Sequence, residues 1–297
     1  AKPAPRVVAT ATGGKLAAGG LSFEVNRAGG VLENFRRRGR VVIARGPRLN
    51  VWRAPTDNDG LKLFPVVNWG GARGLTDWLA AGYNRLELAD SKVSVQPGPT
   101  EVVVDVEQRW LVPGARRFIT HIHRYTLDGA GALQVANEFA IDRQLPELPR
   151  LGVSLVLPTE FEQLAWLGRG PWENYTDRKR SAMVGLYRTT VTADYVPYIV
   201  PQEHGNKTDV RWLHLHDRKG RGVRFLAQPK MEASASHYPA ADLFAAKHTT
   251  DLVARPEVQV NLDYAQRGLG TASCGPDTLP QYRIEPGAYR FGFAIEA

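Results

Sequence analysis

Two acidic side chains stand in one polar, aromatic-rich segment, residues 168–181, which reads GRGPWENYTDRKRS. Its glycines and proline exclude a regular helix, so we expect a loop. Glu173 and Asp177 could act together as a general acid and base, the pairing that hydrolysis of a glycosidic bond requires. The alternative is a structural corner, in which Arg178 neutralises Asp177 and both carboxylates bond backbone or arginine groups.

A second acidic pair, Asp57 and Asp59, lies in the segment WRAPTDNDG. Carboxylates two residues apart share one face of a strand, but in a turn they accept hydrogen bonds from nearby backbone amides. Turn capping is the commoner arrangement. We therefore interpret this pair as structural, with an acid–base role as the alternative.

Histidine and cysteine provide few further catalytic candidates. His121 and His123 share a face of an expected strand and could contribute to a metal site, but no third ligand follows at a suitable spacing, and we favour exposed histidines or histidines satisfied in the core. His204 and His237 lie in polar loops and are better candidates for a binding site. Cys274, the single cysteine, has no neighbouring base and is interpreted as a small packing residue.

Aromatic rings accompany these loops. A pyranose can stack its C–H face on an aromatic ring while its hydroxyl groups bond acids, amides and arginine, so a wall of this composition suits a carbohydrate. Burial in the core is the alternative for any single ring. The rings in or beside the loops are Trp52, Trp69, Trp172, Tyr175, Trp212, Tyr238 and Tyr282.

The segments between the loops are predicted to be β-strands. Apolar residues alternate with period two over residues 101–110, 116–127 and 132–142. The turn sequences PGAR and DGAG separate these runs, as expected between antiparallel neighbours. Similar runs open and close the chain.

Helices are predicted only at residues 75–86 and 240–248. Many antiparallel strands without a βαβ rhythm predict an all-β sandwich. We expect one domain over residues 16–297, preceded by a linker over residues 1–15. Because the sequence starts without Met, we also expect it to be part of a longer polypeptide.

Composition restricts the class of protein. The chain has 297 residues, 43% hydrophobic and 23% charged, as in ordinary globular proteins, and no apolar run is long enough to span a bilayer. One cysteine excludes an intramolecular disulfide and suits the cytoplasm. The net charge of +8 is scattered and no nucleic-acid-binding motif accompanies it, so we expect neither a nucleic acid nor a membrane as partner.

Five loop segments occur in a fixed order: LNVWRAPTDNDG, GRGPWENYTDRKRS, YIVPQEHGNKTDVRWLHL, ASHYPAADL and GLGTASCGP. Together they resemble the C-terminal domain of the large β-galactosidases of glycoside hydrolase family 2, which is a separate small chain in two-gene forms. The resemblance covers nearly the whole chain. It implies a large antiparallel super-sandwich of the galactose-mutarotase type, in agreement with the strands predicted above.

The resemblance implies a component of an enzyme that hydrolyses terminal β-galactosides such as lactose with retention of configuration. The catalytic glutamates of the family lie on a barrel domain elsewhere in the polypeptide, so no catalytic residue is expected here and the isolated chain is expected to be inactive. The implied partners are the barrel-containing remainder, the galactoside substrate and further copies of the full enzyme. The family binds Mg²⁺ and Na⁺ mostly through the barrel, so no metal or cofactor is expected in this chain.

The resemblance also implies that this domain forms one rim of the active-site pocket and stabilises the enzyme. Residues 60–65 and the segment around Cys274 are expected to approach the substrate. Some relatives hold a Trp at the position of Cys274, so stacking on the aglycone sugar is expected to be weaker here. The residues expected on the rim or on the concave face of the sheet are Asn58, Asp59, Gly60, Asn174, Arg178, Glu203, Arg211, His237 and Cys274.

Two other functions stay open. A sugar 1-epimerase of similar fold needs a base and an acid at the sugar ring, for which Glu203 or Asp263 together with His204 or His237 could serve. The other is a carbohydrate-binding module or structural domain without catalysis.

Overall fold

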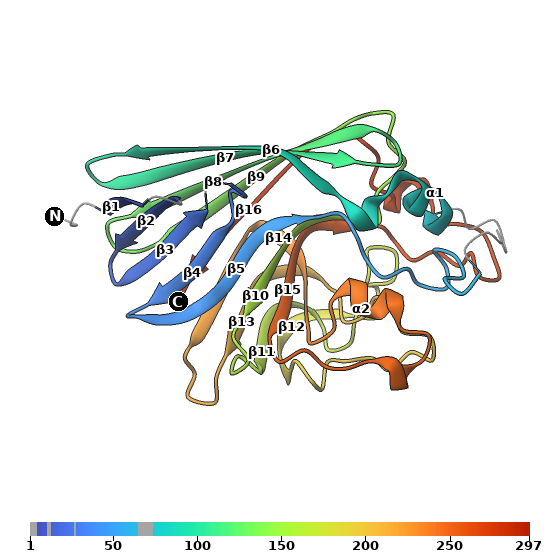
Figure 1. Cartoon of the computed structure of the whole chain (residues 1–297). Helices are drawn as coiled ribbons and strands as arrows, with labels where there is room; N and C mark the ends of the chain where they lie inside the picture. Colours follow the sequence, from blue (N-terminus) through green and yellow to red (C-terminus); the bar gives the residue numbers. More distant parts are fainter. Residues whose placement is uncertain (1–4, 11–12, 27, 65–73) are drawn as a thin grey trace.

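The computed structural model describes residues 5–10, 13–26, 28–64 and 74–297. Over these residues the chain is built almost entirely of β-strands, as Figure 1 shows, and the predicted all-β class is confirmed. The strands are β1 (Arg6–Thr10), β2 (Gly13–Ala18), β3 (Leu21–Asn26), β4 (Leu32–Arg37), β5 (Arg40–Asn50), β6 (Glu87–Pro97), β7 (Glu101–Val112), β8 (Arg117–Asp128), β9 (Leu133–Ile141), β10 (Arg150–Leu157), β11 (Gln163–Gly170), β12 (Met183–Thr190), β13 (Lys207–His216), β14 (Gly222–Ser236), β15 (Val258–Gln266) and β16 (Ala288–Glu296). The helices are α1 (Gly74–Ala81) and α2 (Ala240–Ala245), with 3₁₀-helical turns at Tyr83–Arg85, Thr249–Asp251 and Pro280–Tyr282.

The strands form one antiparallel sheet that folds back on itself. Its path runs β1-β2-β3-β4-β5-β10-β15-β14-β16-β9-β8-β7-β6, and β13, β11 and β12 branch from β14. Figure 1 shows β6–β9 above β2–β5. The two layers meet through aromatic rings, because the ring of Phe23 in β3 lies 6.4 Å from that of Tyr125 in β8, centroid to centroid. The predicted large antiparallel sandwich is therefore confirmed.

Strands β7, β8 and β9 follow the predicted alternation. In β9 every second residue from Leu133 to Ile141 is buried. The turn before β9 forms because Asp128 Oδ1 accepts hydrogen bonds from the amides of Ala130, at 3.0 Å, and Ala132, at 2.8 Å. Local sequence thus determines both the strands and their connection in this part of the sheet.

The N-terminal boundary differs from the prediction. We predict a linker over residues 1–15, yet β1 (Arg6–Thr10) pairs antiparallel with β2 (Gly13–Ala18) as part of the same sheet. The runs RVVAT and GGKLAA are short and rich in small residues, so they do not predict strands by themselves. Hydrogen bonding to β3 holds β2 in the sheet, and β2 in turn pairs with β1.

Both predicted helices are present and both are short. Helix α1 ends at Ala81 because Gly82 takes a φ of +90°, a conformation that favours glycine. Helix α2 ends at Ala245. Trp69 and Pro65, named in the predictions above, lie outside the described residues. In the described part of the chain, no helix is long and apolar enough to cross a membrane.

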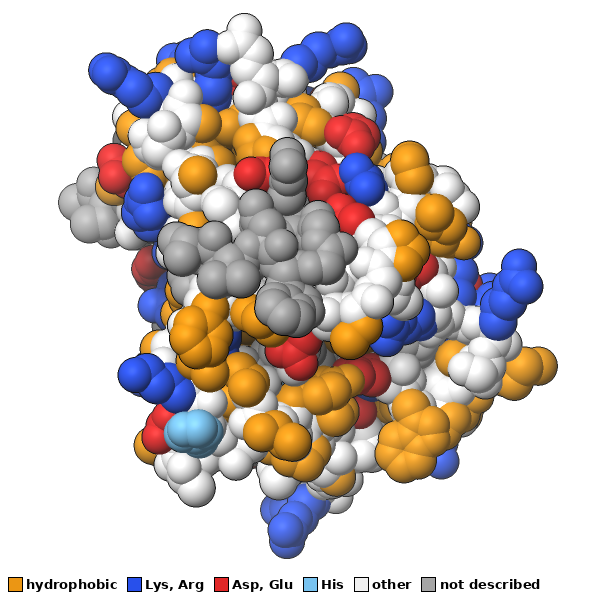
Figure 2. Space-filling model, turned by 90° about the vertical axis from the view of Figure 1, so that its right-hand side faces the viewer, with side chains coloured by type: hydrophobic (Ala, Val, Ile, Leu, Met, Phe, Trp, Pro, Cys, Tyr) orange, Lys and Arg blue, Asp and Glu red, His pale blue; other side chains and the backbone are white. Residues whose placement is uncertain are grey.

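The loops that carry most of the predicted site residues lie at one end of the sandwich. The loop that follows β5 and the loop that follows β15 lie near α1, at the right of Figure 1. Figure 2 shows this end face-on, with acidic side chains among hydrophobic ones.

Candidate functional site

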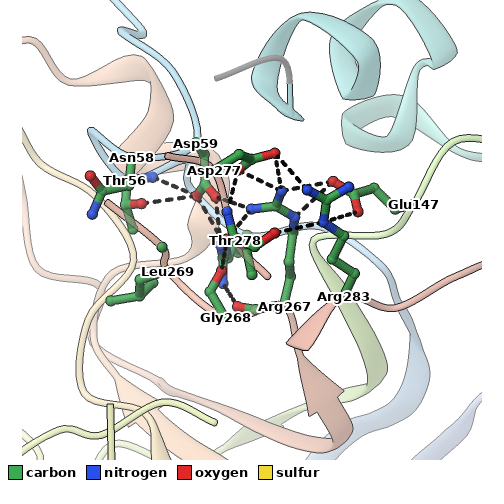
Figure 3. Close-up of polar contacts among 12 residues, drawn as sticks. Thr56, Asn58, Asp59, Glu147, Arg267, Gly268, Leu269, Asp277, Thr278 and Arg283 are labelled. Carbon is green, nitrogen blue, oxygen red and sulfur yellow. Dashed lines mark hydrogen bonds and ion pairs between the residues drawn. The ribbon is translucent and has the colours of Figure 1, made fainter. Parts of the chain in front are cut away.

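Three loops from distant parts of the chain meet at this end, and Figure 3 shows contacts made by residues of the first and the third. They comprise residues 51–64, 171–182 and 267–278, which together we call the loop cluster. Asn58 Oδ1 accepts hydrogen bonds from the amide of Ser273, at 3.1 Å, and from its hydroxyl, at 2.7 Å. This contact joins the first loop to the third.

Asp177 joins the second loop to the third. Its Oδ1 accepts a hydrogen bond from the amide of Leu269, at 3.0 Å, and its Oδ2 from the amide of Gly270, at 2.7 Å. The guanidinium of Arg178 donates to the carbonyl of Gly270. Arg178 therefore does not pair with Asp177, and the predicted neutralisation is wrong, because backbone amides occupy that carboxylate instead.

Asp59 is the buried anchor of the first loop, as Figure 3 shows. The guanidinium of Arg53 donates to both of its oxygens, at 2.6 Å to Oδ1 and 3.1 Å to Oδ2, and the amide of Thr56 donates to Oδ2 at 2.9 Å. The guanidinium of Arg267 lies 3.8 Å from Oδ1, and both guanidinium groups face the ring of Trp78. A carboxylate occupied in this way caps its turn, so the structural interpretation of Asp59 is confirmed.

Arg267 connects this anchor to a second set of charges. It is fully buried and donates to Glu147 at 2.9 Å, to Asp277 at 2.8 and 2.9 Å, and to the hydroxyl of Thr278 at 2.7 Å. Arg283 lies 3.5 Å from Glu147 and 3.3 Å from Asp277. The third loop is therefore held by charge-assisted hydrogen bonds on two sides. No pattern in the sequence pointed to Arg267, because its carboxylate neighbours Glu147 and Asp59 lie far from it in the chain.

Gly60 and Cys274 stand at the edge of the loop cluster. Gly60 has a φ of +141°, and a Cβ there would lie 2.9 Å from Leu75 Cβ, so only glycine fits without strain. Cys274 is exposed with a free thiol. Its interpretation as a packing residue is therefore wrong. The predicted site residues that the structure brings into this cluster are Asn58, Asp59, Gly60, Asn174, Arg178 and Cys274.

Glu203 belongs to a buried group of acids around one arginine. Its Oε1 accepts hydrogen bonds from Arg150 Nη2, at 2.7 Å, and from Gln266 Nε2, at 3.1 Å. Arg150 Nε also lies 3.0 Å from Asp263 Oδ2. Burial raises the pKa of Asp263 well above its usual range and raises the pKa of Glu232 to about 7. Glu232 therefore titrates near neutrality.

Asn174 and Glu203 connect this group to the loops through the backbone. Asn174 Oδ1 accepts a hydrogen bond from the amide of Thr208, at 2.9 Å, and Asn174 Nδ2 donates to the carbonyl of Trp172, at 3.0 Å. The amide of Glu203 donates to the carbonyl of Ala54, at 3.0 Å. Both side chains are buried, so they orient the loops.

Arg211 and His237 lie away from these contacts. Arg211 Nη1 donates to the carbonyl of Asp209, at 2.5 Å, on its own strand β13. His237 Nε2 lies 2.9 Å from Glu162 Oε2, and its Nδ1 lies 3.2 Å from the carbonyl oxygen of Glu257. Among the described residues, neither side chain contacts the loop cluster. Both residues were predicted for the rim or for the concave face of the sheet, and their hydrogen bonds do not support the rim.

The remaining candidates also have structural partners. Glu173 accepts a hydrogen bond from the amide of Gly205, at 2.7 Å, which confirms the predicted corner. His121 and His123 are fully buried with stacked rings, and burial lowers the pKa of His121 to about 4. The core interpretation of this pair is therefore confirmed. Over the described ranges, no group of three or more His, Cys, Asp or Glu side chains could hold a metal ion.

The fold has counterparts among solved structures. An α-mannosidase from Enterococcus faecalis V583 aligns over 98% of this chain and 30% of its own, with a TM-score of 0.51 and 10% identity, which shows the shared fold alone. A galactose 1-epimerase from Lactobacillus acidophilus NCFM aligns over 99% of this chain and 98% of its own, with a TM-score of 0.45 and 12% identity.

The family follows from the sequence match. Residues 17–295 match the family described as beta galactosidase small chain, so the chain belongs to that family. It is 36% identical to a β-galactosidase of Priestia megaterium over 82% of this chain and 22% of that protein. It is 32% identical to one of Vibrio cholerae over 95% of this chain and 27% of that protein. The chain thus spans about a quarter of the length of the curated relatives it matches.

Proposed function

We propose that this chain is the C-terminal, small-chain part of a β-galactosidase and forms one rim of the pocket in which terminal β-galactosides such as lactose are hydrolysed. The match of residues 17–295 to the small-chain family carries the proposal. The β-galactosidases it resembles are about four times longer, which leaves room for a barrel domain with the catalytic glutamates. Because the match spans only about a quarter of each relative, it supports a role for this chain as a component of such an enzyme.

The state of the acids in the loop cluster supports the same proposal. Retaining hydrolysis requires one free carboxylate as nucleophile and a second carboxyl as acid and base. Asp59 is occupied by Arg53, and Asp177 by two backbone amides. These carboxylates position loops, and we assign the nucleophile and the acid to the barrel-containing remainder.

The loop cluster is the part of this chain that we place at the substrate. Asn58, Gly60 and Cys274 stand on a frame held by buried charges, so their positions are fixed before a substrate arrives. Cys274 has no aromatic ring on which the aglycone sugar could stack, so we expect this rim to bind that sugar weakly. Asn174, Glu203, Arg178 and Asp59 act behind this edge as positioning residues.

The partners in the proposed enzyme are the barrel-containing remainder, the galactoside and further copies of the full enzyme. We place the enzyme in the cytoplasm. We assign any Mg²⁺ or Na⁺ requirement to the barrel-containing remainder.

Complementation tests the proposal. Hydrolysis of a chromogenic β-galactoside is measured with this chain alone, with the barrel-containing remainder alone and with the two mixed. We expect activity only on mixing. Robust turnover by this chain alone would contradict the proposal. Carboxylates of this chain would then be candidates for the catalytic nucleophile and acid.

Two asparagine variants then locate the rim. Asn58→Ala breaks the contact with Ser273 and is expected to lower the activity of the mixture. Asn26→Ala is the matched control, because Asn26 Oδ1 also accepts two hydrogen bonds, here from the amides of Ala28 and Gly29 in the turn between β3 and β4. Equal activity of both variants would remove the loop cluster from the rim while leaving the complementation result intact.

A further inference from the structure

Lys62 lies in the first loop of the loop cluster, just after Gly60. Its ammonium group donates hydrogen bonds to three backbone carbonyl oxygens, those of Pro201 at 2.7 Å, Leu243 at 2.6 Å and Ala246 at 2.5 Å. An ammonium group has three N–H donors and no acceptor. These carbonyls, which we call the carbonyl cage, therefore use its whole hydrogen-bonding capacity.

The carbonyl cage is an unusual environment for a lysine. Lysine side chains normally keep the charged group in water or beside a carboxylate. Lys62 is half-buried, and within the described part of the chain it forms no ion pair. Burial lowers the pKa of Lys62, while the charges of Asp57 and Asp251 oppose that shift. Carbonyl oxygens thus take the place of water around this cation, in a region of negative charge.

The fold leaves carbonyls of this cage without other donors at the end of α2. A helix has no amide donors for its last carbonyls, and a lysine near the helix end can supply them. The amide of Lys247 would reach the carbonyl of Leu243 in a continued helix, but it donates to Asp251 Oδ2 instead, at 3.0 Å. Lys62 therefore provides a hydrogen bond that the local backbone does not.

The carbonyl cage joins segments that are distant in sequence. Its carbonyls lie 139 to 184 residues from Lys62 along the chain. On the other side of Gly60, Asp59 is held by the buried guanidinium of Arg53. Gly60 therefore lies between two fixed points, one at Asp59 and one at Lys62.

The same arrangement of oxygen atoms suits a free cation. Backbone carbonyl oxygens coordinate alkali cations in other proteins, so the carbonyl cage is a cation site that the chain fills with its own side chain. Lys62→Ala removes three carbon atoms and the ammonium group, and it leaves buried acceptors without donors, which costs free energy. n-Propylammonium consists of the same three carbon atoms and an ammonium group.

We propose that Lys62 is a positioning residue of the rim, whose ammonium group in the carbonyl cage fixes Gly60 at the substrate edge, and that the cage accepts a free alkylammonium ion when this side chain is removed. The effect on hydrolysis rests on the function proposed above, whereas occupation of the cage does not. Lys62 acts through the backbone at Gly60 and contacts no reacting atom.

Thermal melting of the isolated chain tests the cage. Lys62→Ala is melted with n-propylammonium chloride on the order of 0.1 M, because a free amine lacks the effective concentration of a tethered one. Tetramethylammonium chloride at the same concentration is the matched control, since it has the charge but no N–H donor. We expect n-propylammonium to raise the Tm of Lys62→Ala and not that of the parent. No rise, or an equal rise with both salts, overturns the proposal.

The complementation assay tests the positioning role. We expect Lys62→Ala to raise KM for the chromogenic galactoside about tenfold with a smaller change in kcat, and n-propylammonium to restore KM. Lys247→Ala is the matched control, an exposed lysine just after α2 that is outside the carbonyl cage. A parental KM in Lys62→Ala overturns the positioning role, even where melting supports the cage.

Lys62→Met keeps the aliphatic part of the side chain and lacks the ammonium group. We expect it to raise KM as Lys62→Ala does and not to respond to n-propylammonium, because its side chain occupies the space of the added ion. A parental KM in Lys62→Met overturns the proposal even where Lys62→Ala does not fold. Absence of hydrolysis in the parental mixture contradicts the function proposed above, and the melting experiment then decides on the cage alone.

Discussion

Replacement of Glu232 by Gln is expected to stabilise the chain in a pH-dependent way. Glu232 is buried, and burial raises its pKa from 4.5 to about 7. A raised pKa means that the folded chain prefers the protonated acid, so the stability contribution is fully present below pH 4.5 and is lost as pH rises through about 7. The difference between the two pKa values, at about 1.4 kcal/mol per pH unit, corresponds to about 3 kcal/mol.

Glutamine mimics the protonated acid and does not titrate. Its carbonyl oxygen can accept the hydrogen bonds that Glu232 Oε2 takes from Asn206 Nδ2, at 2.8 Å, and from the amide of Gln266, at 3.3 Å. We therefore expect Glu232→Gln and the parent chain to unfold alike at pH 4.5, and the variant to be more stable by about 3 kcal/mol at pH 8.

Urea unfolding at a series of pH values between 4.5 and 8 measures this difference, and other titrating groups cancel because they are common to both chains. Glu107→Gln on β7 is the control, because Glu107 is exposed. A stability difference between parent and Glu232→Gln that stays constant across this range would refute the reasoning.

Three further predictions concern the loop cluster. Asp59→Ala leaves the buried guanidinium of Arg53 without its carboxylate and is expected to cost about 3–5 kcal/mol in urea unfolding; a loss below about 1 kcal/mol would contradict the anchoring role. Gly60→Ala forces a Cβ against Leu75 at a φ of +141° and is expected to reduce the activity of the complemented enzyme, whereas Gly39→Ala, with a φ of +82° and open space around it, controls for backbone strain alone. Cys274 is expected to react rapidly with a thiol reagent in the isolated chain and slowly after mixing with the remainder; unchanged reactivity would place this loop away from the partner.

Local sequence predicted the elements well where one strand follows the next. Strands β7, β8 and β9 are consecutive, their alternation is strict, and the turn residues between them determine the connection. The helices could be predicted in position but not in length, because Gly82 ends α1 through its own conformation. Strands β1 and β2 were missed because β3 supplies most of what stabilises them.

Reasoning from the residues alone predicted contacts of the candidate site only between residues close in sequence, whereas Arg178 and Cys274 were named through the resemblance. Asp59 caps a turn made by its neighbours Arg53 and Thr56, so its structural role could be read from the sequence. Arg267 could not be found, because it meets Arg53 across a separation of 214 residues. That meeting depends on the order of strands in the sheet, which places β5 next to β10 and β10 next to β15. Nothing in the segment QRGLG indicates this order.

The buried charges of the loop cluster act on orientation more than on stability. A buried ion pair contributes little net free energy compared with apolar side chains of the same volume, because both charges lose their hydration. Apolar side chains, however, pack without a fixed direction, whereas the bidentate contact between Arg53 and Asp59 has one geometry. Arg53 also donates to the carbonyl of Arg267, so this geometry is passed from the end of β5 to the end of β15. We infer that the chain retains these charges because a rim built from separate loops must keep its edge residues in register with a catalytic pair that lies on another domain.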